Sequence, residues 1–159
     1  MKLKTQFRLM LCLSLALVGC RDDEDVANSE TNRLRGTWNL VYQQINGKKL
    51  PDEKMAEAFH GKMVFVGDEI HYTVELQGFD FQFDYTLNPG QNPKAMDLRL
   101  TAATDQRGIG QELFGIYRLN QDSLEICYSR NKRPMDFFAG EGSNNTLIVL
   151  KRESGVADQ

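Results

Sequence analysis

Residues 79–87 read Phe79-Asp80-Phe81-Gln82-Phe83-Asp84-Tyr85-Thr86-Leu87. In this stretch every odd-numbered residue is aromatic or aliphatic, and every even-numbered residue is polar. Side chains alternate between the two faces of a β-strand, so this strict period-two pattern predicts a strand with one buried face. The strand is expected to turn a row of aromatic side chains toward the protein interior.

The same alternation continues on both sides of this stretch. Residues 70–76 alternate in the same way, and Gln77-Gly78 is short enough to join the two stretches as a hairpin. Further strands are predicted at 38–42, 96–101, 124–128 and 146–152. Most of the chain between residues 34 and 152 is therefore expected to be β-structure.

Only residues 51–59 show helical character. Pro51 suits the first turn of a helix, acidic residues follow it, and Met55 and Phe59 are spaced to share one face. One short helix after the first strand, followed by antiparallel strands, predicts an up-and-down β-barrel of about eight strands, with a tight sandwich as the alternative. Closure into a barrel would remove exposed strand edges.

The first twenty residues have the pattern of a lipoprotein signal peptide. Lys2, Lys4 and Arg8 precede an apolar run over residues 9–18, which is too short to span a bilayer. The run ends in Leu17-Val18-Gly19-Cys20, which matches a lipobox. We therefore expect cleavage after residue 19, lipidation of Cys20 and anchoring of the protein to a membrane by acyl chains.

Removal of the signal changes the charge of the chain. The full sequence has 19 basic and 22 acidic residues, and residues 1–19 contain three basic and no acidic ones. The mature chain would then carry 16 basic and 22 acidic residues. This acidic balance argues against nucleic acid as a partner, because a nucleic-acid binder needs clustered cations.

The chain divides into four predicted segments. Residues 1–19 form the signal peptide, and residues 20–33 form a polar, acidic and flexible tether after the lipid anchor. Residues 34–152 form a single β domain, within the usual size for one core. Residues 153–159 form a short disordered tail.

Two features of the domain resemble the lipocalin-like superfamily. Gly36-Thr37-Trp38 stands at the head of the first predicted strand, and Lys151-Arg152 ends the last one. In lipocalins a tryptophan in a Gly-x-Trp motif closes one end of the barrel and packs against a basic residue from the final strand. The resemblance implies a lipocalin-like barrel with Trp38 at one end.

A second resemblance covers residues 34–152. Ordered blocks along the domain are similar to a family of unknown function found mainly in exported Planctomycetes proteins. The matching blocks are Leu34-Arg35-Gly36-Thr37-Trp38, Asn46-Gly47, Leu50-Pro51, Leu87-Asn88-Pro89, Pro93-Lys94-Ala95-Met96-Asp97, Gly115-Ile116-Tyr117-Arg118-Leu119, Asp122-Ser123-Leu124-Glu125-Ile126-Cys127, Arg133-Pro134, Phe137 and Leu150-Lys151-Arg152. The resemblance implies a family identity without an activity.

The candidate site residues fall into two groups. The core-facing or ligand-facing group is aromatic, and its members are Trp38, Tyr72, Phe79, Phe81, Phe83 and Tyr85. The polar group is expected at the barrel ends, with Lys94 and Asp97 as a polar pair, and its members are Lys94, Asp97, Arg133 and Arg152. The long connection over residues 129–145 is expected either to cover one barrel end as a binding loop or to cap the core.

Catalysis is not expected. Cys127 is the one cysteine left in the domain, and neither histidine lies in a nucleophile motif or in a metal-binding spacing, so a buried thiol is the preferred interpretation. Asp80 and Asp84 could serve a hydrolase, but strand parity turns them away from the aromatic face. No metal site and no cofactor are predicted.

Three functions remain open from the sequence. The preferred one is a cell-envelope lipoprotein whose barrel acts as a binding or interaction domain, with an envelope protein as a partner. The second is a carrier of a small apolar ligand inside the barrel, and the third, least favoured, is a hydrolase. Arg21 follows the predicted lipidated cysteine, where Asp would favour retention in the inner membrane, so an outer-membrane location facing the periplasm is expected.

Overall fold

The computed structural model describes residues 22–50, 60–75 and 78–154. The predicted signal peptide, Cys20 and the predicted helix at 51–59 lie outside these residues, as does the end of the tail at 155–159. Within the described residues, no helix is long and apolar enough to span a bilayer.

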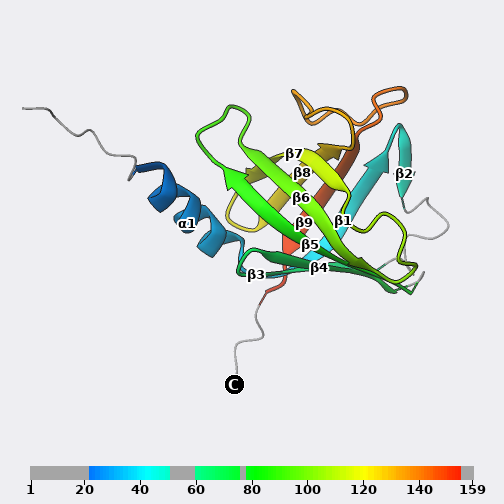
Figure 1. Cartoon of the computed structure of the whole chain (residues 1–159), viewed down its shortest axis with the longest axis horizontal. Coiled ribbons are helices and arrows are strands. Elements are labelled where there is room, and N and C mark those ends of the chain that lie inside the picture. Colours follow the sequence, from blue (N-terminus) through cyan, green and yellow to red (C-terminus); the bar gives the residue numbers. More distant parts are fainter. Residues whose placement is uncertain (1–21, 51–59, 76–77, 155–159) are drawn as a thin grey trace, which may run out of the picture.

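The described chain contains one helix followed by nine strands (Figure 1). Their bounds are α1 Asp22–Leu34, β1 Gly36–Ile45, β2 Lys48–Leu50, β3 Gly61–Val66, β4 Glu69–Val74, β5 Phe79–Asn88, β6 Ala95–Ala103, β7 Glu112–Leu119, β8 Ser123–Ser129 and β9 Thr146–Arg152. The predicted strands at 70–76, 79–87, 96–101, 124–128 and 146–152 are thereby confirmed to within a few residues.

The strands form a closed antiparallel barrel of eight strands, which confirms the predicted fold class. Each strand from β3 to β8 pairs with the next along the chain, and β1 closes the barrel by pairing with both β3 and β9. The short strand β2 forms a hairpin with the end of β1 and stands outside the ring. The described helix precedes β1, whereas the sequence predicts a helix after it.

The half of the barrel nearest α1 is filled with side chains. Its interior is built from the inward-facing residues of every barrel strand, among them Trp38, Phe65, Met96 and Leu124, all at most 1% exposed. The void left in the middle of the barrel, beside Ile126, has a volume of only about 10 Å³. A space of that size hardly holds a water molecule, so this half is a packed core.

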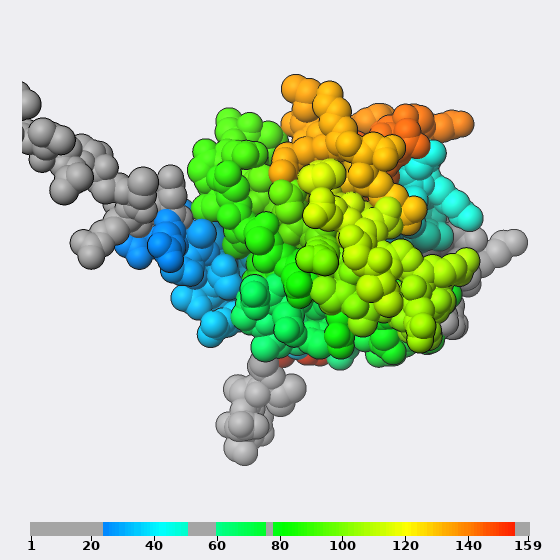
Figure 2. Space-filling model, viewed as in Figure 1, coloured from blue at the N-terminus to red at the C-terminus, as the bar shows by residue number. Residues whose placement is uncertain are grey.

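Residues 22–34 form helix α1 instead of the predicted flexible tether. The helix leads into the closed end of the barrel, and in Figure 2 it projects from that end as the blue atoms. Its own sequence is polar, but Glu30 and Leu34 are buried against the barrel. Tertiary contacts at its last turn therefore stabilise a helix that its composition does not predict.

The connection over residues 130–145 covers part of the outer wall. Ala95, Ile116 and Cys127 are neighbours across β6, β7 and β8, and all three are buried although they lie outside the barrel core. In the connection, the Phe137 ring lies 4.6 Å from the Arg118 guanidinium on β7, and the orange connection lies beside the yellow strand residues in Figure 2. This part of the loop therefore packs on the outer wall of the barrel.

Arg133 ties the loop to the wall. Its guanidinium donates a hydrogen bond to the carbonyl oxygen of Gly115 at 2.6 Å and another to a carboxylate oxygen of Asp97 at 2.8 Å. Gly115 is required at its position, because a Cβ there would lie 2.7 Å from the carbonyl oxygen of Met96. The strands approach closely at this glycine, which is a common reason for glycine inside a strand.

Candidate binding site in the open end of the barrel

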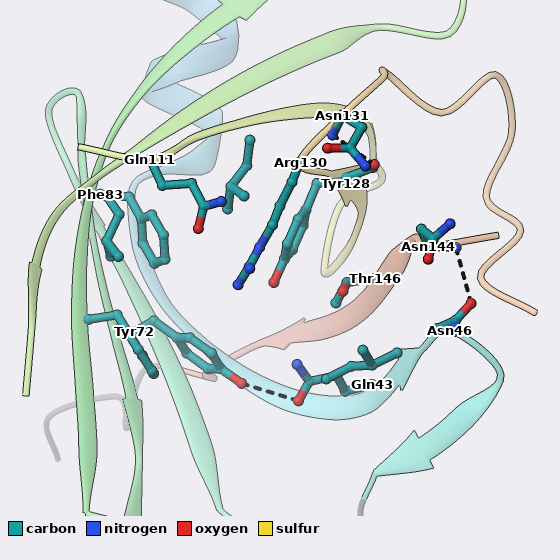
Figure 3. A pocket seen from close by; sticks show the side chains of 15 residues that line it. Gln43, Asn46, Tyr72, Phe83, Gln111, Tyr128, Arg130, Asn131, Asn144 and Thr146 are labelled. Carbon is teal, nitrogen blue, oxygen red and sulfur yellow. Dashed lines mark hydrogen bonds between the residues drawn. The ribbon is translucent and has the colours of Figure 1, made fainter. Parts of the chain in front are cut away.

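The end of the barrel opposite α1 holds a cavity of about 490 Å³ (Figure 3). This volume is within the range of small-molecule binding sites, which is roughly 300–1,000 Å³. The cavity opens at the ends of the strands and is closed below by the packed core. The cavity therefore has the shape of a cup with a single opening, and it is called the cup below.

Apolar side chains from three neighbouring strands form one wall of the cup. Phe81 and Phe83 from β5 lie in loose contact, with ring centroids 6.3 Å apart, and Leu100 from β6 and Leu113 from β7 continue the wall. The alternation of residues 79–87 produces this wall because its odd-numbered members all face inward. Two of the predicted aromatic residues, Phe81 and Phe83, therefore line the cavity on this wall, and a third, Tyr72, lines it from β4.

Tyrosine and glutamine side chains add polar groups to the lining. Tyr72 from β4 donates a long hydrogen bond of 3.5 Å to the side-chain oxygen of Gln43 on β1 (Figure 3). Gln111 and Tyr128 face the same space. These groups supply hydrogen-bond donors and acceptors next to the apolar wall.

The rim is formed by the two ends of the loop over residues 130–145. Arg130 and Asn131 come directly after β8, and Asn144 precedes β9. The backbone N–H of Asn144 donates to the side-chain oxygen of Asn46, which joins this loop to the β1–β2 turn. Figure 3 shows the Arg130 side chain running beside Tyr128 with its guanidinium end directed into the cavity.

Burial raises the pKa of Tyr128 to about 12, while Thr146 and the nearby charge of Arg130 act in the opposite direction. Burial likewise raises the pKa of Tyr72 well above its ordinary value. Both hydroxyl groups are therefore neutral at neutral pH. They can donate or accept hydrogen bonds but cannot serve as bases.

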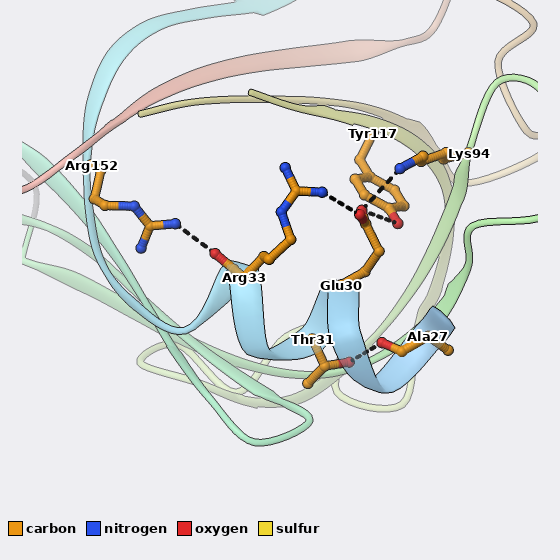
Figure 4. A network of polar contacts seen from close by, with 7 residues as sticks. All are labelled: Ala27, Glu30, Thr31, Arg33, Lys94, Tyr117 and Arg152. Atoms are coloured by element: carbon orange, nitrogen blue, oxygen red, sulfur yellow. Dashed lines mark hydrogen bonds and ion pairs between the residues drawn. The ribbon is translucent and has the colours of Figure 1, made fainter. Parts of the chain in front are cut away.

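The polar residues predicted for the barrel ends lie outside this cavity. Lys94 is 3.1 Å from a carboxylate oxygen of Glu30, and Tyr117 donates to the same oxygen at 3.0 Å (Figure 4). Arg33 pairs with the other oxygen of Glu30. Lys94 thus holds α1 to the closed end, and the predicted pair between Lys94 and Asp97 is wrong because each has another partner.

Trp38 and Arg152 meet at the closed end as the lipocalin resemblance implies. The Arg152 guanidinium lies 4.0 Å from the centroid of the Trp38 ring, and the Trp38 indole N–H donates to the carbonyl oxygen of Leu34 at 2.8 Å. Arg152 also donates to the carbonyl oxygens of Arg33 and Arg35. These bonds satisfy carbonyl groups at the C-terminal end of α1.

The remaining predicted residues have structural positions. Tyr85 is buried near the closed end, donates to the carbonyl oxygen of Gly67 at 2.8 Å and packs edge-on against Phe65. Phe79 is half-buried beside Phe81 but is not among the residues that line the cavity. Asp97 and Arg133 lie on the outer wall, not at a barrel end.

Sequence reasoning missed the most prominent polar residue of the cavity. Leu124, Ile126 and Tyr128 are alternate residues that face the barrel interior. Arg130 is the next residue at the same spacing and lies directly after the end of β8. That spacing is a signal that could have located it. Gln43, Gln111 and Asn144 carry no comparable signal, because their approach to the cavity depends on barrel closure and loop geometry.

The described residues offer little chemistry beyond binding. Cys127 lies outside the barrel core, away from the cavity, and burial raises its pKa to about 11 with a smaller contribution from Asp136. Asp80 and Asp84 are exposed on the outer face of β5. Within the described part of the chain, no group of three or more His, Cys, Asp or Glu side chains is arranged to hold a metal ion.

No protein-family model matches the chain, and no curated protein matches it either. The resemblance to the Planctomycetes family therefore stays a prediction from the residue blocks.

Proposed function

We propose that this protein is a cell-envelope lipoprotein without catalytic activity, whose barrel binds a small ligand in its open end. The observation that carries the proposal is the cavity of about 490 Å³ above a packed core. A barrel of eight strands can be filled by its own side chains or can hold one small ligand. Here the half of the barrel nearest α1 is filled and the opposite half is hollow. This favours a protein that carries a small ligand over an interaction module, whose barrel would be filled and whose surface would contact another protein.

The lining also supports a ligand with both apolar and polar parts. Phe81, Phe83 and Leu113 offer an apolar surface, whereas Gln43 and Arg130 offer polar groups within the same cavity. Ligand sites commonly combine a mostly apolar lining with a few polar groups that fix orientation. The ligand is therefore amphipathic.

The position of α1 supports an orientation on the membrane. The helix begins at Asp22, shortly after the predicted lipidated Cys20, and its last turn is bound to the closed end by Glu30. A lipid anchor at Cys20 would hold the barrel by that end. The mouth would then open away from the bilayer, toward the periplasm in an outer-membrane protein.

Native mass spectrometry tests the proposal. The chain from Arg21 onward, which contains every described residue, is purified without detergent and examined before and after incubation with an envelope extract. A reproducible added mass that disappears on denaturation is expected. Thr146→Trp, which places an indole in the cavity, should remove the added mass, whereas Val41→Trp on the exposed outer face of β1 should retain it.

A clean mass in both conditions would contradict the carrier and favour the alternative, an interaction module. One observation supports that alternative: Met135 and Phe138, in the loop over residues 130–145, are 79% and 60% exposed. Exposed apolar side chains of this size on one loop are typical of a surface that contacts another protein. The search would then move to partners of this loop.

A further inference from the structure

The cavity has an uneven distribution of charge. Of the 15 described residues that line it, Arg130 is the only one with a charged side chain, and no Asp or Glu is among these described residues. The other polar groups of the lining are amides and hydroxyls. The electrostatic potential inside the cup is therefore expected to be positive, although the chain as a whole is acidic.

Arg130 is not neutralised by the described part of the protein. Arginines 33, 107, 118 and 133 each pair with a carboxylate. Arg130 belongs to no ion pair among the described residues, and its guanidinium end is directed into the cavity beside the Tyr128 ring. A guanidinium presents a fork of N–H donors that matches an anionic group with two oxygens.

The apolar wall lies within the same cup as this cation. Phe81 and Phe83 stand on β5, and Leu100 and Leu113 follow on β6 and β7. A molecule that places an anionic group against Arg130 can therefore bury its apolar part against these side chains. Burial of apolar area and a charge-assisted hydrogen bond then both stabilise the binding of one ligand.

We infer that the ligand is a small amphipathic molecule with one anionic head group, which binds Arg130 while its apolar part lies against Phe81 and Phe83. This inference rests on the proposed function, because it specifies the ligand class of the same cavity. A cationic amphipath would be repelled by Arg130, and a neutral one would leave its donors without an anionic partner.

Isothermal titration calorimetry with three matched probes tests the inference. Decanoate, decanol and decyltrimethylammonium share a ten-carbon chain and differ in head-group charge. The two ionic probes are titrated below their micelle-forming concentrations, and decanol below its solubility limit, into the chain from Arg21 onward. We expect decanoate to bind about tenfold more tightly than decanol, since a hydrogen bond to a charged group supplies a difference of that order. Binding of the ammonium probe should be weakest.

Three variants locate the selectivity. Arg130→Gln should weaken decanoate binding about tenfold and leave decanol binding unchanged, while Arg130→Lys should retain the preference for the anion. Lys132→Gln is the matched control, because Lys132 is an exposed cation in the same loop that does not line the cavity. Far-ultraviolet circular dichroism and a thermal melt establish that each variant is folded.

The outcomes separate the two proposals. If no probe binds the folded protein, the proposed function is wrong and the inference falls with it. If decanol binds as tightly as decanoate, or Arg130→Gln leaves decanoate binding unchanged, the cavity binds ligands but the inference about the anionic head is wrong. Anion preference that disappears in Arg130→Gln and persists in Lys132→Gln supports the inference.

Discussion

Trp38 is fully buried at the closed end of the barrel, where its indole N–H donates to Leu34 and the Arg152 guanidinium covers the ring. One side chain thus contacts α1, the core and the last strand together. The Gly-x-Trp motif predicted the position of this tryptophan correctly. Gly36 and Trp38 lie on β1 and Arg152 lies on β9, and these two strands pair to close the barrel. The contribution of this side chain to stability can therefore be tested by a single substitution.

Replacement of Trp38 by Ala should lower the free energy of unfolding by about 3–5 kcal/mol, because it removes a large buried side chain and leaves a cavity. Urea unfolding followed by circular dichroism measures the change. Val66→Ala is the control: this side chain is 58% exposed, and its removal should change stability by less than about 0.5 kcal/mol. Equal effects of the two substitutions would contradict the closing role of Trp38.

Glu30 should make stability depend on pH in the acid range. Burial acts to raise its pKa, but hydrogen bonds from Lys94 and Tyr117, with the charges of Lys94 and Arg33, outweigh burial and hold the pKa below its ordinary value. A lowered folded-state pKa means that the ionised form stabilises the fold above about pH 4.5, and that this contribution is lost as the pH falls through the folded-state pKa.

Glu30→Gln should therefore destabilise the protein by about 1–3 kcal/mol near neutral pH and progressively less below pH 4.5. Urea unfolding of wild type and variant at a series of pH values measures this difference. Since other carboxylates titrate in both proteins, only the difference between them reports on Glu30. A difference that stays constant down to pH 3 would contradict the assignment.

At the scale of elements, the period-two alternation predicted the strands whose outward-facing side chains are exposed to solvent. Strand β5 has polar residues at every outward position, and the sequence located it within one residue. Strands β3 and β7 were missed, because apolar residues on their outer faces interrupt the alternation: Val64 and Val66 in β3, and Phe114 and Ile116 in β7. Helix α1 was missed because its stability comes from contacts with the barrel end and not from an apolar periodicity of its own.

The loop over residues 130–145 should protect the Cys127 thiol. Arg133 fixes this loop to Gly115 and Asp97, and Cys127 beneath it is fully buried with a pKa of about 11. In the chain from Arg21 onward, which retains no other cysteine, Arg133→Ala should speed the reaction of Cys127 with a disulfide reagent by about tenfold or more.

Arg107→Ala is the control for this experiment, since Arg107 pairs only with Asp105 in an exposed turn. Absorbance of the released thiolate gives the reaction rate. Rapid reaction of wild type, or equal rates in the two variants, would show that the loop does not cover the thiol.

At the scale of the whole molecule, the two ends of the barrel differ in structure. The closed end binds α1 through Glu30, Trp38 and Arg152, and the open end holds the cavity with Arg130 at its rim. The proposed lipid anchor precedes α1 and belongs to the closed end. The proposed function therefore separates anchoring and ligand binding along the barrel axis.

Cys20→Ser should prevent lipidation and abolish anchoring through acyl chains, which otherwise contribute about 0.8 kcal/mol per buried methylene group. Because the substitution also blocks the predicted cleavage, a second variant replaces residues 1–20 by a cleavable secretory signal without a lipobox. That variant should appear in the soluble envelope fraction after fractionation and immunoblotting. Membrane association of this variant, equal to wild type, would contradict the lipobox interpretation.

The sequence by itself determined the barrel, its closing tryptophan and the aromatic wall, since strand alternation and short-range motifs are local properties of the chain. Tertiary structure alone decided that one half of the barrel is filled and the other hollow, because void volume depends on how side chains from all strands meet. It also decided the partners of Lys94 and Asp97 and the approach of Gln43, Gln111 and Asn144 to the cavity. These contacts join residues far apart in the chain, and only barrel closure brings them together.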